Sequence, residues 1–163
     1  MAAVVERVCD YPRPPVLVES AVHVRVEALG QLLVDSHRSL RVLETFHPPT
    51  VYLPPEAVRQ ELLQPSAGAS FCEWKGVARY FDVVVDPGGS AERRLRRAVW
   101  TYPEPSEPFA ALAGWLALYP ALMDGCWLAG ERVTPQPGGF YGGWITSAVV
   151  GPFKGDPLHP ELV

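Results

Sequence analysis

The sequence is poor in side chains that bind metals. Its three cysteines, none in a CxxC pair, are Cys9, Cys72 and Cys126. Its four histidines, which do not share the short spacings of metal ligands, are His23, His37, His47 and His159. The sequence therefore predicts no metal site and no cofactor. Three cysteines cannot all pair, which favours a reducing compartment, and we expect a cytoplasmic protein.

Long apolar runs and an excess of positive charge are also missing. No apolar stretch approaches the ~20 residues that a membrane-spanning helix needs. The first seven residues lack the basic start and apolar run of a signal peptide. The net charge of −4 offers no electrostatic surface for nucleic acid. We expect neither a membrane nor a nucleic-acid partner, and the sequence leaves a homodimer open. The only basic cluster, residues 93–97, is expected in a solvated loop or at a strand edge.

Proline, by contrast, is abundant, with 18 among 163 residues spread along the chain. Each proline fixes φ and removes a backbone donor, which disfavours long helices and favours short strands joined by rigid turns. The length suits one domain with its own core. The composition therefore predicts a mainly β fold with short helices.

Alternation of apolar and polar residues locates the strands. Residues 22–27 and 31–35 are predicted to form a hairpin around Leu29-Gly30. Further strands are predicted at residues 40–44, 51–53, 76–85, 98–102, 115–119, 126–128 and 131–133. Two short helices are predicted, one from Pro54 to Pro65 with Val58 and Leu62 inward, the other at residues 108–112.

The chain changes character at both ends. Residues 1–21 are expected as an N-terminal extension packed on a domain at residues 22–133. From residue 134 to residue 163 the chain is rich in glycine and aromatic residues, and such a segment is too aromatic to stay unpacked. We expect this tail to lie on the domain and to bury Phe140, Tyr141 and Trp144.

Several short motifs resemble one bacterial family, domain of unknown function 427. They cover residues 22 to about 133 and are residues 41–45, Tyr52-Leu53-Pro54, Cys72-Glu73-Trp74-Lys75-Gly76, Trp100-Thr101-Tyr102-Pro103 and Tyr119-Pro120. The tail is similar to that of a longer subgroup. The resemblance implies two small antiparallel sheets in a β-tent-like arrangement. The wider group includes zinc-bearing proteins and a domain that holds a cyclic imide in an aromatic cage. Because this chain lacks the cysteine pairs, only the cage carries over, as a fold-level analogy.

The aromatic residues of these motifs suggest a ligand pocket. Trp74 would supply a flat wall, Lys75 a mobile cation, and Gly76 a close backbone turn. Trp100 and Tyr102 share one face of a strand because side chains alternate. The alternative is that the rings fill the core. The predicted ligand-binding residues are Arg41, Glu44, Tyr52, Trp74, Lys75, Tyr80, Trp100 and Tyr102.

Three functions remain open at this point. The first is a small-molecule-binding module whose Arg41 and Lys75 orient an anionic or carbonyl-bearing ligand. The second is a metal-independent enzyme that uses His47, Cys72 or Lys75. The third is a protein-interaction module that docks through the aromatic tail. A nucleotidyltransferase label attached to the family finds no support, because no Asp-x-Asp pair follows Gly89-Ser90.

Overall fold

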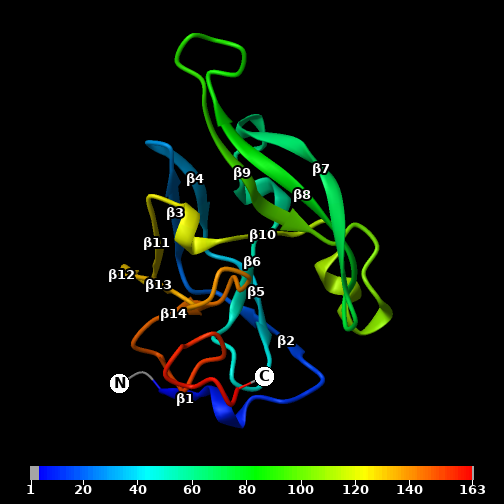
Figure 1. Ribbon diagram of the computed structural model, residues 1–163, viewed down its shortest axis with the longest axis vertical. Helices are drawn as coiled ribbons and strands as arrows, with labels where there is room; N and C mark the ends of the chain where they lie inside the picture. Colours follow the sequence, from blue (N-terminus) through cyan, green and yellow to red (C-terminus); the bar gives the residue numbers. More distant parts are fainter. Residues whose placement is uncertain (1–3, 163) are drawn as a thin grey trace.

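The computed structural model describes residues 4–162 and shows a mainly β protein, as predicted (Figure 1). All helical segments among these residues are short 3-10 helices. They are η1 (Val8–Asp10), η2 (Pro55–Ala57), η3 (Gln60–Leu62), η4 (Glu107–Leu112) and η5 (Pro120–Leu122). Residues 1–3 of the predicted N-terminal extension and residue 163 of the predicted tail lie outside the described part.

The strands of the described residues form five sheets. One four-stranded sheet has the order β10-β9-β8-β7 and contains β7 (Leu63–Cys72), β8 (Gly76–Val85), β9 (Arg93–Thr101) and β10 (Leu116–Leu118). The second has the order β12-β11-β3-β4 and contains β3 (Val24–Ala28), β4 (Gln31–Ser36), β11 (Gly125–Leu128) and β12 (Glu131–Arg132). A three-stranded sheet has the order β2-β5-β6 and contains β2 (Val16–Ser20), β5 (Ser39–Leu43) and β6 (Thr50–Tyr52).

Two small ribbons complete the structure near the chain ends. The antiparallel ribbon pairs β13 (Thr134–Pro135) with β14 (Trp144–Ile145), and the parallel one pairs β1 (Glu6–Arg7) with β15 (Val149–Val150). The C-terminal segment therefore returns to the N-terminal one, at the end of the molecule opposite the long β8–β9 hairpin (Figure 1).

Two sheets were expected and five are observed among the described strands. One connection between two of the five sheets accounts for part of this difference. Leu53 and Leu116 exchange backbone hydrogen bonds of 2.8 and 2.9 Å, which join the edge of β6 to the edge of β10. The three-stranded sheet thus continues into the sheet of β7–β10. The predicted hairpin at residues 22–35 is found as β3 and β4, with Val24 and Val26 fully buried.

Side-chain alternation in the joined sheet creates two separate cores. In β10, Leu116 and Leu118 pack with the sheet of β3 and β4, while Ala117 points to a second, aromatic cluster. The residues of β6 divide in the same way, since Val51 joins the first core and Tyr52 the second. Because successive side chains of a strand point to opposite faces, one sheet serves both cores.

The helix predicted from Pro54 to Pro65 is wrong in its extent. Val58 and Leu62 are buried as expected, but the segment consists of η2 and η3 only. The backbone N–H of Arg59 donates to Leu33 O over 2.9 Å, across to β4, which interrupts the helical hydrogen bonds. Pro65 does not stop a helix but lies in β7, which tolerates it because β7 is an edge strand with a register shift beginning at this residue.

The tail packs on the domain, but it does not bury all three predicted aromatic residues. Trp144 is buried and Tyr141 is half-buried, as expected. Phe140 is 88% exposed, so its predicted burial is wrong. Phe140 lies in the loop between β13 and β14, two positions after Gly138, whose positive φ a residue with a Cβ rarely adopts.

Candidate functional site

The turn between β7 and β8 holds Lys75 in place. Cys72 pairs with Gly76 across this hairpin, and Gly76 has a φ of +102°, which a residue with a Cβ adopts only under strain. The turn is fastened to the following loop, since Ser106 donates its backbone N–H to Lys75 O over 3.0 Å and its hydroxyl to Trp74 O. The glycine and these two bonds fix the backbone from which Lys75 extends.

The ammonium group of Lys75 lies among aromatic rings. Its Nζ is 5.8 Å from the ring centroid of Tyr102 and 5.8 Å from that of Phe109. Within residues 4–162, Lys75 has no carboxylate partner within 4 Å. Ring faces attract a cation but leave its N–H groups free to donate. Lys75 is therefore a cation that can still bind an acceptor.

Four aromatic side chains from β6, from β9 and the residue after it, and from the end of β10 converge beside Lys75. Tyr52 and Trp100 meet edge to face with ring centroids 6.3 Å apart, and the indole N–H of Trp100 donates to the Tyr52 hydroxyl over 3.1 Å. Tyr102 lies 6.5 Å from Tyr52, and Tyr119 lies 4.6 Å from Trp100. Trp100 and Tyr102 share one face of the chain, as alternation predicted.

These rings surround a cavity of about 170 Å³. Its lining consists of Thr50, Tyr52, Lys75, Tyr80, Trp100, Tyr102, Tyr119, Phe140 and Gly142. Five of the predicted ligand-binding residues are thus brought together. Trp74 packs against the same aromatic cluster, half-buried, without lining the cavity.

Three tyrosines of the cavity have a pKa above the ordinary value of a tyrosine. Burial is the largest cause that raises the pKa of Tyr52 and Tyr102, and the nearby hydroxyls raise both values further. The pKa of Tyr119 rises to about 12 through burial and the neighbouring Tyr80. One hydroxyl group raises the pKa of another only when the two groups lie close together. At neutral pH Tyr52, Tyr102 and Tyr119 therefore present O–H donors and not phenolates.

Tyr80 is held at the rim of the cavity by two contacts. Its hydroxyl lies 2.6 Å from Ser70 Oγ, and the guanidinium of Arg97 stacks 4.1 Å from its ring centroid. Arg97 reaches this position because it lies in a bulge of β9, with a φ of +50°. The bulge is thus what places a second cation against the aromatic wall.

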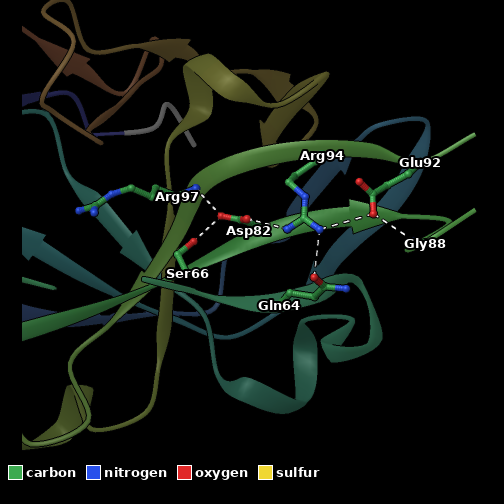
Figure 2. Close-up of polar contacts among 7 residues, drawn as sticks. All are labelled: Gln64, Ser66, Asp82, Gly88, Glu92, Arg94 and Arg97. Carbon is green, nitrogen blue, oxygen red and sulfur yellow. Dashed lines mark hydrogen bonds and ion pairs between the residues drawn. The ribbon is translucent and has the colours of Figure 1, made fainter. Parts of the chain in front are cut away.

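A buried carboxylate stabilises that bulge (Figure 2). Asp82, 7% exposed, accepts hydrogen bonds from the Ser66 hydroxyl, the Arg97 backbone N–H at 2.9 Å and Arg94 at 2.7 Å. Burial alone would raise the pKa of Asp82, but these three donors together lower it. Arg94 also contacts Gln64 and Glu92, so this arginine of the basic cluster is engaged in a structural network.

Arg41 and Glu44 do not belong to the cavity, so their predicted place in the pocket is corrected. Leu40 and Val42 of β5 contact the aromatic cluster, and alternation turns Arg41 to the opposite face. There its guanidinium binds Glu6 at 2.5 Å. Glu44 follows β5 and faces Arg13 at 3.7 Å.

The two other residues considered for catalysis, His47 and Cys72, do not line the cavity. His47 Nδ1 lies 3.1 Å from Gln136 Nε2, and its ring meets Tyr141 edge-on at 5.4 Å. Burial is the main cause that lowers the pKa of His47, and the positive charge of Lys154 adds to it. Cys72 is half-buried and lies beside Tyr102 in the wall of the aromatic cluster.

Four lining residues were missing from the predicted site. Tyr119 stood in a family motif and directly follows β10, so its motif was the signal. Thr50 is the first residue of β6, two positions before the predicted Tyr52 and therefore on the same face of the strand. Phe140 and Gly142 come from the tail, and no local pattern links them to residues 52–102.

Two general features of the described structure accompany the site. In the part of the chain that the structure describes, His, Cys, Asp and Glu side chains nowhere gather in a group of three that could hold a metal ion. Among residues 4–162, no helix has the length and apolar character needed to cross a membrane.

Comparison with known proteins places the chain in one family. Residues 16–129, which include all the cavity residues except Phe140 and Gly142, match the family model described as a domain of unknown function, DUF427. No curated protein matches the chain. The match spans well over half of the 163 residues, so this protein belongs to the DUF427 family.

Proposed function

We propose that this protein is a cytoplasmic small-molecule-binding module whose aromatic cavity takes a small anionic ligand. The observation that carries the proposal is the chemistry of the lining. Lys75 contributes a cation, and Thr50 and four tyrosines contribute hydroxyl groups. None of the described lining residues is an aspartate or glutamate. Such a cavity attracts an oxyanion and disfavours a cation.

The hydroxyl geometry supports the same ligand class. The Tyr52 oxygen already accepts a bond from Trp100 Nε1, so its own proton is free to donate to a ligand. Tyr102 and Tyr119 are O–H donors as well, and burial raises the pKa of both further above neutrality. Hydroxyl donors fixed in advance around the cavity favour a carboxylate or a carbonyl oxygen, because little ordering is needed on binding.

The cavity is smaller than the 300–1,000 Å³ or so of typical drug-sized pockets. It therefore suits a compact ligand. The three free thiols are in keeping with a reducing compartment.

Thermal unfolding with small probes tests the proposal. The probes are acetate, benzoate and inorganic phosphate, with methylammonium as a cation of similar size. A ligand at 100 times its Kd should add about 2.7 kcal/mol to the free energy of unfolding. We expect at least one anion to raise the unfolding temperature and methylammonium to have no effect.

The two lysines of the chain provide a matched pair of variants. Lys75→Met removes the charge at the cavity and keeps an apolar stem, while Lys154→Met removes a charge that does not line it. The rise in unfolding temperature that the anion causes should disappear in Lys75→Met and persist in Lys154→Met. The proposal is wrong if no anion stabilises the wild type, or if both variants respond like it.

A further inference from the structure

A second cavity lies on the other face of β5 and β6. The aromatic cavity takes Thr50 and Tyr52 from β6, whereas Val51 between them lines the second cavity. Ser39 and Arg41 of β5 line it as well. Because successive side chains of a strand point to opposite faces, one sheet separates the two cavities. The volume of the second cavity is about 340 Å³, within the range of about 300–1,000 Å³ of typical ligand pockets.

Segments from both ends of the chain complete the second cavity. β1 contributes Glu6, and β14 and β15 contribute Trp144 and Val149. Glu6 pairs with Val149 across the parallel ribbon, at the end of the molecule opposite the long β8–β9 hairpin (Figure 1). All three residues lie outside the family match at residues 16–129. The second cavity is therefore not a property of the matched domain alone.

The walls of the second cavity are mainly apolar. Nine of its fifteen lining residues are valine, leucine, alanine, proline or tryptophan. Among them, Val51, Trp144 and Val149 are buried. Walls of this composition suit a largely apolar molecule, whose orientation is set by the few polar groups among them.

The positive charge in the second cavity is already neutralised. The Arg41 guanidinium binds both carboxylate oxygens of Glu6, at 2.5 and 3.3 Å. The hydrogen bond from Arg41 is the largest cause that lowers the pKa of Glu6, so this carboxylate is ionised at neutral pH. Glu19, the remaining charged lining residue, is exposed and therefore screened by water. The site thus offers little net attraction to an ion, and burying an ion costs more than burying a neutral group.

Ser39 supplies an unused hydroxyl in this wall. The residue is 3% exposed, and its hydroxyl has no hydrogen-bond partner among residues 4–162. The indole N–H of Trp144, which is 1% exposed, also lacks a partner within the described chain. Buried polar groups without a partner are uncommon in folded proteins. An oxygen of a ligand in this cavity would give the Ser39 hydroxyl its missing partner.

We infer that the second cavity binds a small uncharged molecule with an apolar body and one carbonyl or hydroxyl group. The apolar body would lie against Val51 and Val149, and the oxygen would pair with the Ser39 hydroxyl. This inference goes beyond the proposed function and does not depend on it, because the two cavities lie on opposite faces of the sheet.

NMR titrations with four compounds that share a six-membered ring test the inference. Cyclohexanone and cyclohexanol are neutral, cyclohexanecarboxylate is an anion, and cyclohexylammonium is a cation. The assigned indole N–H signal of Trp144 should shift to saturation with both neutral compounds. Each ion should need at least a tenfold higher concentration for the same shift. Lys75→Met, which changes the aromatic cavity only, should leave the binding of cyclohexanone within twofold.

Variants of Ser39 test its role. Ser39→Ala should weaken cyclohexanone binding about fivefold, as expected for the loss of one hydrogen bond. Ser39→Thr keeps the hydroxyl and should bind cyclohexanone within twofold of the wild type. Ser90→Ala is the control, because Ser90 is exposed in the turn between β8 and β9 and does not line the second cavity.

Each possible failure overturns a stated part of the inference. If neither neutral compound shifts the Trp144 signal to saturation, the second cavity is not a binding site. If either ion shifts this signal at as low a concentration as cyclohexanone, the ligand is not restricted to uncharged molecules. If Ser39→Ala binds cyclohexanone like the wild type, Ser39 is not the polar contact. The proposed function is unaffected by these results, because its own test depends on anions and Lys75.

Discussion

The indole N–H of Trp100 donates to the hydroxyl of Tyr52 across 3.1 Å, although 48 positions separate the two residues. Both side chains are more than nine-tenths buried. This bond orients two of the aromatic side chains that line the cavity and leaves the Tyr52 proton pointing away from Trp100.

Tyr52→Phe should destabilise the protein by about 1–3 kcal/mol, because it leaves a buried indole N–H without an acceptor. Urea unfolding measures the change. Tyr80→Phe is the control, since its hydroxyl pairs with Ser70 at an exposed position, and we expect a loss below about 0.5 kcal/mol. If both variants lose the same free energy of unfolding, the hydrogen bond from Trp100 to Tyr52 does not contribute to stability as predicted.

Asp82→Asn should also destabilise the protein, by about 1–3 kcal/mol, because a neutral amide cannot accept from all three donors. The pKa of Asp82 is lowered in the folded state, so its contribution is complete above about pH 3.9, the unfolded value. The contribution is lost as the pH falls through the lower folded value. Unfolding free energies measured from pH 7 to pH 2 check both statements.

Asp10→Asn serves as the control for Asp82. Asp10 is exposed, and its contact with Arg7 is long, with 4.0 Å between the nitrogen and oxygen atoms. Its loss should lie within about 0.5 kcal/mol of zero. If the acid unfolding curve of Asp82→Asn matches that of the wild type, the network in Figure 2 does not stabilise the fold.

His47 should make the stability depend on pH in mildly acidic solution. Burial lowers its folded pKa below the unfolded value of about 6.5, so the unfolded state binds the proton more tightly. Stability is then complete above pH 6.5 and falls as the pH decreases toward the folded pKa. Thermal unfolding between pH 7.5 and pH 5 should show this decline, and His47→Gln should flatten it. His159→Gln is the control, because the side chain of His159 is 40% exposed, and this variant should keep the wild-type slope of unfolding temperature against pH. If the wild type and both variants have the same slope, His47 is not the cause of the pH dependence.

Gly76→Ala should cost about 1–2 kcal/mol, because its φ of +102° is unfavourable for a residue with a Cβ. It should also weaken anion binding, since the turn carries Lys75. Gly139→Ala is the control for stability: it has open space around its Cβ position and no left-handed φ. Chemical denaturation of both variants tests the difference, and equal stabilities would mean that the turn relaxes without strain.

Local patterns predicted much of the β structure. The alternation in β3, the apolar run of β8 and the hairpin of β11 and β12 were all identified, because each strand buries one regular set of side chains. Strand β7 was not, since its residues Leu63–Cys72 are mostly small or polar and its pairing with β8 supplies the order. The helix predicted before it failed for a related reason, as a bond from Arg59 to Leu33 decided the local conformation.

The sequence by itself determined that Trp100 and Tyr102 face the same side, that Gly76 permits a tight turn, and that Lys75 belongs to it. Those are consequences of alternation and backbone sterics within a few residues. Only the tertiary structure decided which distant groups meet there. It turned Arg41 away toward Glu6 and brought Tyr119, Phe140 and Gly142 to the cavity. Such choices depend on how sheets join and where the tail is anchored, and those contacts link residues too far apart for any local pattern to record.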